Sequence, residues 1–426
     1  MAVGRVVRHR KHQEGGVIVT VSLVLLFLLG FMGIALDFGH LFIVKTELQT
    51  AMDSCALAAA QELDGESTAL TRATNAGMTA GNLNNVNFQS ATWSGKGKIV
   101  SADITFKDSA YSATTVAANA RYAQCQHTQS GVNMWLLQSL GAFSGSTATY
   151  PNNQAVLALA VATRASAQST CPIPVGLLPK AGGAAPNYGF QVGEWVTLIG
   201  KGVASSGEMG WYNLDGSSSA NETKNELSEG GRCGTKVGDT LGTPGIQSSV
   251  DVVWNYRFGI YKQSDPGPST NHPDFSGYAY TSTNWTNAVP QNAWSGIPAT
   301  GSDPTAANFV TKRAAFASYD DTGSKLSGGD AITGLKLNSF KTIATPNAGG
   351  EHQQYGYNRR VVTVPVLNSS SSVIDYACMF MLAPLSGPTV DNALEFLGNA
   401  GSLTSPCATN GLPGGSAGPL VPVLVR

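Results

Sequence analysis

Residues 17–36 carry no charged side chain, and four basic residues, Arg5, Arg8, Arg10 and Lys11, precede them. A helix of this length rises about 30 Å, which is the thickness of the hydrocarbon core of a bilayer. Basic residues beside a span favour the cytoplasmic side. The sequence therefore predicts a cytoplasmic basic tail at 1–16 and a transmembrane helix at 17–36, with the remaining chain outside the cytoplasm.

A secretory signal peptide is the alternative to an anchor. The apolar region of a signal peptide usually has only about 7–15 residues. Residues 34–38 read Ile-Ala-Leu-Asp-Phe, which offers no obvious small-x-small cleavage site. We favour an uncleaved anchor, and the question of N-terminal processing stays open.

The composition of the chain argues against nucleic acid as a partner. Charged residues make up 12% of the chain, and the residues beyond the anchor include 22 Lys and Arg against 26 Asp and Glu. This slight excess of acidic residues, without a cluster of basic ones, gives no surface that would attract nucleic acid. The 49 glycines and the many Ser, Thr and Asn predict a β-rich, turn-rich exterior.

All cysteines of the chain follow the anchor, and their even number favours disulfides in an oxidising compartment. No Cys-x-x-Cys occurs, so we expect no zinc site or other metal. Six cysteines allow fifteen pairings. The preferred pairs are Cys55–Cys125, Cys171–Cys233 and Cys378–Cys407, and buried free thiols are the alternative.

The helix should continue beyond the bilayer. Residues 37–63 contain no proline and are rich in Ala, Leu, Gln and Glu, which favour helix. Gly65 suits the left-handed position that ends a helix. Apolar or small residues recur by threes and fours and form a seam, which packs either on this protein's own outer domain or on a helical partner. The seam residues are Leu41, Val44, Leu48, Ala51, Cys55 and Ala58.

Residues 10–65 resemble the N-terminal segment of TadE/TadG-like proteins of bacterial tight-adherence (Flp) pilus assembly systems. The resemblance combines the anchor, an Asp-x-Gly at 37–39, a Leu-Gln-x-Ala at 48–51 and the alanine-rich helix end at 56–63. Residues 210–214 and 419–425 relate the rest of the chain only loosely to large TadG-like members. Prepilins cleaved by the prepilin peptidase carry Glu five residues after the cut Gly, and Val21 stands there if Gly16 is that Gly.

The resemblance implies a membrane-anchored assembly or accessory component, not a processed pilin subunit. It implies a single-pass protein of the bacterial inner membrane, with a cytoplasmic N-terminus and a periplasmic or extracytoplasmic bulk. The implied partners are the membrane and other pilus-assembly proteins, such as TadE/TadF-like proteins or pilin helices. We expect no nucleic acid, cofactor or small-molecule substrate.

Asp37 is the most unusual residue of the anchor region, because it is an ionisable residue at the edge of the apolar run. It lies on the same helical face as Gly30 and Gly33. Small residues permit close helix approach, and ionisable groups near a bilayer usually find a partner. We predict that these residues contact a partner's transmembrane helix. Alternatively, Asp37 marks the headgroup boundary. The full predicted docking face is Gly30, Gly33, Asp37, Leu41, Val44 and Leu48.

The fold class expected from these patterns is α+β. Residues 37–170 should form a stalk helix and a pilin-like antiparallel sheet, 171–186 a proline-rich linker, and 187–426 a β-rich, loop-heavy domain. In the first domain we expect helices at 66–82 and 132–140, a hairpin of 88–93 and 99–106, and strands at 117–126 and 154–165. In the second we expect strands at 195–199, 250–261, 360–367, 374–382 and 420–425, with an irregular stretch at 263–350.

No constellation in the sequence supports catalysis. Asp215–Ser219 fits the Asp-x-Ser-x-Ser cation motif, but no regular strand–helix alternation follows, so we interpret it as a polar turn. Gly414–Gly418 fits Gly-x-Ser-x-Gly, but no acid or His follows it. Four residues could in principle meet in space, and we interpret each as a solvated loop residue: His272, His352, Asp274 and Glu351.

We therefore expect a non-enzymatic component of Flp/Tad (type IV-like) pilus assembly that docks through its N-terminal helix. The alternative is a membrane-tethered adhesin or glycan-binding module, and a tethered hydrolase is weaker still. Aromatic side chains that could line a glycan-binding face, or pack in the core, are Trp211, Trp254, Trp285 and Trp294.

Overall fold

The structure is a computed structural model of an α+β protein with two compact units. Unit 1 comprises Met1–Thr163 and Leu424–Arg426, and unit 2 comprises Arg164–Val423. The predicted basic tail lies outside the described residues up to position 13. The structure describes residues 14–136, 145, 152–228, 231–244, 249–261, 265–276, 280, 292–294, 309, 354–385 and 387–425.

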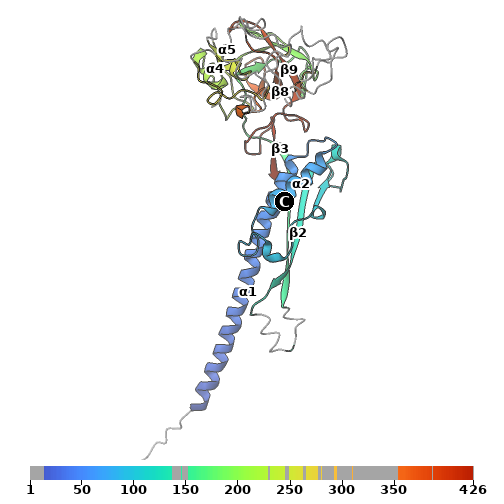
Figure 1. The fold of residues 1–426 in the computed structure, drawn as a ribbon, viewed down its shortest axis with the longest axis vertical. Helices are drawn as coiled ribbons and strands as arrows, with labels where there is room; N and C mark the ends of the chain where they lie inside the picture. The colour runs from blue at the N-terminus through green and yellow to red at the C-terminus, as the bar shows by residue number, and fades with distance from the viewer. Residues whose placement is uncertain are drawn as a thin grey trace, which may run out of the picture. The chain divides into compact units, whose positions relative to one another are not determined.

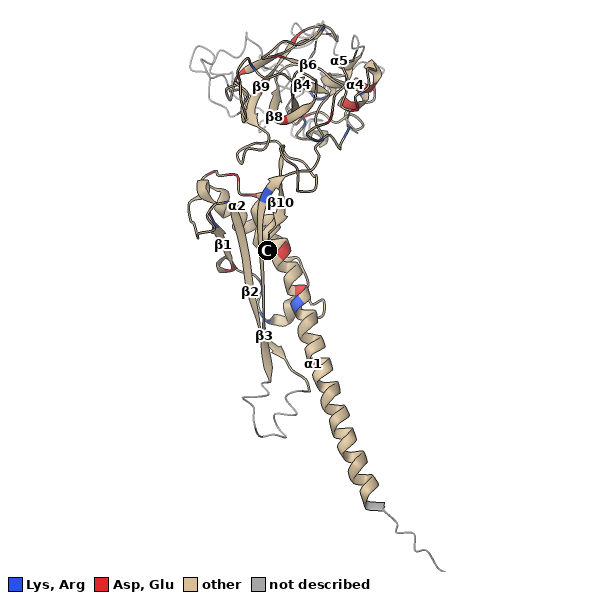
Figure 2. Cartoon of the chain, turned by 180° about the vertical axis from the view of Figure 1, so that it is seen from behind, with Lys and Arg blue, Asp and Glu red and all other residues tan. Residues whose placement is uncertain are grey.

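Unit 1 is built on one long helix, α1 (Glu14–Gln61). Residues 16–32 expose nearly all of their apolar side chains, and this end of α1 shows neither blue nor red in Figure 2. The hydroxyls of Thr20 and Ser22 donate to carbonyls four residues earlier, at 2.8 Å each, so they are satisfied within the helix. Among the described residues, this one helix is long and apolar enough to cross a membrane.

A second helix, α2 (Ala69–Asn82), packs back on α1 after a reversal that includes Gly65, whose φ is +85° as the left-handed position requires. Two glycines of α2 allow its backbone to approach the backbone of α1 closely. A Cβ on Gly77 would lie 3.2 Å from the carbonyl oxygen of Cys55, and one on Gly81 would lie 3.1 Å from that of Ala51. The close approach explains why α2 is rich in small residues.

A four-stranded sheet runs beside the C-terminal part of α1 (Figure 1), in the order β1 (Ile104–Lys107), β2 (Tyr122–Asn133), β3 (Asn153–Ser166) and β10 (Leu420–Leu424). The pairs β1–β2 and β2–β3 are antiparallel. The inward side chains of β2 and β3 meet the predicted seam of α1, which forms the core of unit 1. In that core, Cys125 of β2 is bonded to Cys55 of α1.

The hairpin predicted for 88–93 and 99–106 does not form. Residues 88–92 form a turn, followed by the 3-10 helix η1 (Trp93–Gly95), and β1 pairs with β2 instead. Trp93 is fully buried and its indole N–H donates to the carbonyl of Asn84 at 2.8 Å. Trp93, which suggested a strand, is therefore a core residue at the start of the 3-10 helix η1.

The helix predicted at 132–140 is also wrong in its described part, because Val132 and Asn133 end β2, and residues 134–136 are not helical. Residues 137–140 lie outside the described residues. The strand predicted at 117–126 starts later, after the 3-10 helix η3 (Ala117–Asn119). The helix at 66–82 and the strand at 154–165 are confirmed as α2 and β3.

Unit 2 is a closed barrel. Its strand order is β4 (Val175–Leu177), β6 (Met209–Trp211), β5 (Trp195–Leu198), β9 (Asn392–Asn399), β8 (Val373–Met381) and β7 (Val361–Leu367). The pairs β4–β7 and β5–β6 are parallel, and the remaining neighbours are antiparallel. A closed sheet has no edge strand on which another chain could add.

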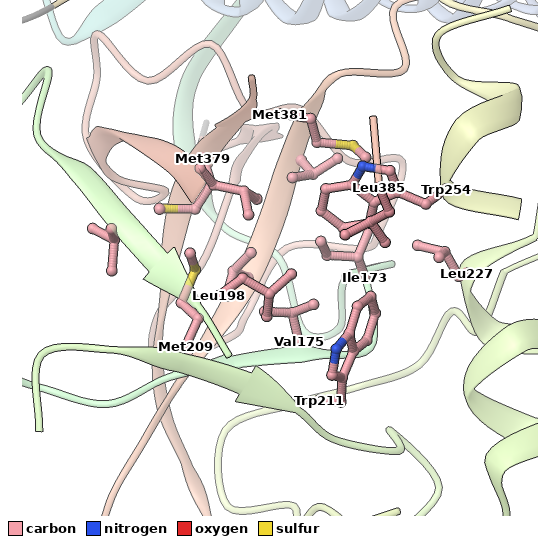
Figure 3. Close-up of a cluster of buried hydrophobic side chains, with 14 of the residues drawn as sticks. Ile173, Val175, Leu198, Met209, Trp211, Leu227, Trp254, Met379, Met381 and Leu385 are labelled. Carbon is pink, nitrogen blue, oxygen red and sulfur yellow. The ribbon is translucent and has the colours of Figure 1, made fainter. Parts of the chain in front are cut away.

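Apolar side chains fill the core of unit 2, as Figure 3 shows. They come from the strands and from two short helices, α4 (Ala220–Leu227) and α5 (Val250–Tyr256). Trp211 and Trp254 meet edge to face, with ring centroids 5.9 Å apart. The buried guanidinium of Arg360 lies 4.5–4.9 Å from three aromatic ring centroids and donates to the Met381 carbonyl.

Several expectations for unit 2 need correction. The strand predicted at 250–261 does not form: residues 250–256 are helix α5, because Val250, Val253 and Trp254 have helical spacing and all enter the core, and 257–261 are turn and irregular structure. Residues 420–425 contribute β10 to the four-stranded sheet, not a strand to the barrel. The segment 171–186, expected as a linker, contains β4. Strands at 195–199, 360–367 and 374–382 are confirmed as β5, β7 and β8. Most of 263–350 lies outside the described residues.

The structure contains the three disulfides that the sequence analysis preferred. Besides Cys55–Cys125 in unit 1, they are Cys171–Cys233 and Cys378–Cys407 in unit 2. The last one ties β8 to the segment after β9.

Candidate functional site

The face of α1 that carries the predicted docking residues lies against the end of β2. Asp37 is fully buried there. Its Oδ1 accepts a hydrogen bond from the backbone N–H of Trp135 at 2.8 Å, and its Oδ2 accepts one from Leu136 at 2.9 Å. β2 has ended at Asn133, so these N–H groups have left the strand ladder and need acceptors. One carboxylate supplies an oxygen to each, and an ionised acceptor makes the stronger bond.

Gly33 lies one helical turn before Asp37 and allows this contact. A Cβ at Gly33 would lie 2.9 Å from the Cβ of Leu136, too close for two carbon atoms. A Cβ at Gly30 would meet nothing within 4 Å among the described residues. Of these two glycines, Gly33 is the one that the packing of the described residues requires.

His40 lies one turn after Asp37 and is 4% exposed. Its Nε2 lies 2.8 Å from Oδ1 of Asn87. Its ring contacts those of Phe88 and Trp135, with centroid distances of 4.7 and 4.6 Å, and the latter two rings lie 5.8 Å from each other. Phe88 and Trp135 each remain about half exposed. The imidazole therefore joins α1 to two segments distant in the sequence.

The loop that carries Phe88 has an unusual backbone. Three consecutive residues, Asn87, Phe88 and Gln89, have φ values of +65°, +57° and +57°. L-residues other than glycine rarely adopt this left-handed region, and each costs about 1 kcal/mol or more. The Gln89 backbone N–H and side-chain amide both donate to Glu47 Oε1, at 3.1 and 2.9 Å. Contacts with α1 thus hold the loop at both of its ends.

Further along α1, the contact becomes the core of unit 1. Val44 and Leu48 are fully buried, and Leu41 is partly buried against the same cluster. Lys45 donates to the carbonyl of Leu157, and Gln49 donates to that of Leu159 at 2.9 Å. Side chains of α1 therefore bond the backbone of β3 as well as pack on the sheet.

The predicted docking face is, in this structure, largely an intramolecular one. The residues after β2 contact Gly33 and Asp37, and the sheet covers Val44 and Leu48. That Gly30, Gly33 and Asp37 contact a partner's transmembrane helix stays a prediction. Asp37 does more than mark a boundary, because its carboxylate holds two backbone N–H groups. Sequence reasoning missed His40, although the spacing 33, 37, 40, 44, 48 places it on the same helical face. The α1 surface at 16–32 is not covered by other described residues.

Unit 2 contains a cluster of carboxylates at the polar turn. Single oxygens of Asp215, Glu222 and Glu226 lie within 4.8 Å of one another. Glu226 is 3% exposed, and it accepts hydrogen bonds from the backbone N–H groups of Leu214 and Asp215 at 2.8 and 3.1 Å. Burial raises the pKa of Glu226 to about 7. These bonds show that Glu226 holds the backbone of the turn at Leu214 and Asp215.

A second buried carboxylate, Glu395, lies on β9. It accepts hydrogen bonds from the indole N–H of Trp195 at 3.3 Å and from the backbone N–H groups of Ala293 and Trp294 at 2.6 and 3.3 Å. Burial raises its pKa to about 7, although these donors oppose the rise. Glu395 thus attaches residues 293 and 294 to the barrel.

Of the four residues that the sequence analysis singled out as able to meet in space, the structure describes two, His272 and Asp274. Asp274 is fully buried and accepts hydrogen bonds from the N–H groups of Arg359 and Arg360, at 2.8 and 3.2 Å. His272 lies against the ring of Tyr357. His352 and Glu351 lie outside the described residues. Gly415 packs so closely on the Ala167 carbonyl that a Cβ would lie 1.8 Å from it, so the predicted non-catalytic loop has a packing role.

The tryptophans considered for a glycan-binding face lie largely inside unit 2. Trp254 is fully buried and Trp211 is 8% exposed. Trp294 packs on the rings of Phe309 and Phe380. Trp285 lies outside the described residues.

Comparison with known protein families gives a match at the N-terminal helix. Residues 15–62 match the family model for Flp pilus-assembly TadE/G-like proteins. This segment coincides almost entirely with α1, and it includes the apolar run and the α1 residues Gly33, Asp37 and His40 that contact the residues after β2. No curated protein and no solved structure matches the chain.

Proposed function

We propose, from the TadE/G-like segment at residues 15–62, that this chain is a non-enzymatic, membrane-anchored component of an Flp/Tad (type IV-like) pilus assembly system. It is held in the bacterial inner membrane with its N-terminus in the cytoplasm. The residues of unit 1 beyond position 36 and all of unit 2 lie on the periplasmic or extracytoplasmic side. The basic residues before the apolar run support this orientation.

The observation that carries the proposal is the continuity of α1. One helix provides both the apolar run of membrane-spanning length and the core face of unit 1. Asp37 fastens the end of β2 to this helix where the apolar run ends. A displacement of α1 along or about its axis would therefore move unit 1 with it.

The exposed apolar part of α1 at 16–32 supports a place for the partner contact. The chain's own segments cover Gly33, Asp37, Val44 and Leu48, so we place the contact with TadE/TadF-like or pilin helices on the uncovered part. Such contacts would depend on close van der Waals packing, because the hydrophobic effect does not drive helices together inside the lipid.

The test is complementation of a deletion strain. The full-length chain should restore surface pili, measured by shearing and immunoblotting, whereas an exported form that lacks residues 1–36 should not. The truncation ends at 36 because residues 44–63 belong to the core of unit 1. Full restoration by the unanchored form would refute a role for the anchor, and normal pili in the deletion strain would refute the pilus role.

Co-isolation with the pilus machinery provides a second readout. The full-length protein should retain the machinery in mild detergent, and the truncated form should lose it. Equal retention by both forms would show that binding resides in the outer units alone.

A further inference from the structure

Exposed aromatic side chains surround α1 just beyond its apolar run. We call Phe38, Phe42, Phe88 and Trp135 the aromatic collar. Their exposed fractions are 48%, 69%, 50% and 48%. They come from α1, from the loop after α2 and from the residues after β2. Large exposed aromatic groups gathered at one level of a protein indicate an interaction surface.

The level of the collar along α1 is set by its contacts. With 1.5 Å of rise per residue, the apolar run 17–36 spans about 30 Å, and Phe38 and Phe42 lie about 3 and 9 Å beyond it. Trp135 is bonded to Asp37, and Phe88 is stacked on His40, so both rings are attached at the same level. The interfacial layer of a bilayer is about 5–8 Å thick on each side of the hydrocarbon core. Phe38 and the rings attached at its level therefore fall within this layer, and Phe42 lies at its outer edge.

The backbone around Phe88 supports a role for this exposure. Three successive left-handed residues cost several kcal/mol in all, on the order of 1 each. The conformation leaves Phe88 half exposed, so burial of its ring in unit 1 recovers little of that cost. Strain of this kind is found where a side chain must be held in a functional position.

We propose that the aromatic collar inserts into the headgroup boundary on the outer face of the bilayer and fixes the depth of α1. Tryptophan and other aromatic rings favour this boundary, where one part of the ring meets acyl chains and the other meets water. A partner helix would cover one stripe of the surface, whereas a lipid surface meets all of the collar residues at one height. The inference rests on the proposed function only in taking α1 as a membrane anchor.

The collar can be tested by depth-dependent quenching in the full-length protein. It is reconstituted into vesicles of phosphatidylethanolamine and phosphatidylglycerol with a nitroxide lipid labelled either at the headgroup or in the middle of an acyl chain. Because the chain has seven tryptophans, the signal is the difference between wild type and Trp135→Phe. We expect the headgroup label to quench this difference signal, and the mid-chain label to quench it less.

Two further variants, each made in the Trp135→Phe background, provide matched controls. Phe88→Trp should restore quenching by the headgroup label. Leu83→Trp should not, although Leu83 is 79% exposed. Leu83 follows Gly81, which packs near Ala51, and Ala51 lies about 21 Å along α1 from Asp37.

The outcomes separate this inference from the proposed function. A protein that floats with vesicles but shows no loss of quenching in Trp135→Phe would overturn the collar and leave the anchor intact. Equal restoration by Leu83→Trp and Phe88→Trp would overturn it as well. Failure of the protein to float with vesicles would overturn the anchor, and the collar with it. Shielding of Trp135 from both labels in floating protein would indicate burial by another protein surface.

Discussion

Replacing Asp37 by asparagine should release the end of β2 from α1. The native carboxylate presents one oxygen to each of two backbone N–H groups, those of Trp135 and Leu136. A carboxamide has only one acceptor oxygen, and its NH₂ group would face the other N–H. The variant therefore loses one charge-assisted hydrogen bond and leaves one buried donor opposed by another donor.

The size of the effect follows from these two losses. A hydrogen bond to a charged group contributes about 1.5–3 kcal/mol, and an unsatisfied buried donor costs about 1–3 kcal/mol. We take about 3 kcal/mol as the decrease in the free energy of local opening, which corresponds to roughly a hundredfold change in the opening equilibrium. The effect should be confined to the segment around 134–136 and the residues stacked on it.

Amide hydrogen exchange of the full-length protein in detergent measures this opening directly. Peptides that contain residues 135 and 136 should exchange about 100-fold faster in Asp37→Asn than in wild type. Asp53→Asn is the matched control, since Asp53 lies on the same helix and accepts only a side-chain bond from Gln49, at 2.8 Å, among the bonds described. Unchanged exchange at 135 and 136 in Asp37→Asn would refute the reasoning.

Three other predictions concern packing, cross-linking and pH. Gly33→Ala should lower the stability of unit 1 by about 1–3 kcal/mol through overpacking, whereas Gly30→Ala should not lower it, as thermal unfolding in detergent will show. Replacing both Cys55 and Cys125 by alanine should lower the free energy of unfolding by about 4 kcal/mol on the chain-entropy estimate for a separation of 70 residues, and a urea midpoint equal to wild type would contradict this. Because burial raises the pKa of Glu395 from 4.5 to about 7, the folded state holds its proton more tightly, and the stability of unit 2 should fall by up to about 3 kcal/mol as pH rises from 4.5 to 7. Glu395→Gln should remove that part of the fall in urea unfolding followed by tryptophan fluorescence, and an identical pH profile would contradict it.

The elements with strong periodicity were predictable from sequence. The anchor and stalk form one helix, and its seam at Val44 and Leu48 enters the core of unit 1. Most of the strands of unit 2 that were predicted from β-prone runs also formed. These predictions succeeded because a repeat of apolar residues decides which local structure can bury them.

The failures involve segments in which local preference and tertiary packing conflict. Residues 250–256 are rich in β-branched and aromatic residues, yet the helical spacing of Val250, Val253 and Trp254 fits the core, and they form α5. Trp93 suggested a strand, but it is buried from a turn. In both places, the burial of one large side chain outweighed the average preference of its neighbours.

Sequence by itself determined a helix long and apolar enough for a membrane, a face suited to packing, and a set of cysteines able to pair, because each depends on the order of neighbouring residues. Only the tertiary structure decided what covers that face. The N–H groups that Asp37 binds belong to residues 98 and 99 positions later in the chain. They need an acceptor only because β2 ends at Asn133, and where a strand ends depends on its partners across the sheet, not on its own sequence.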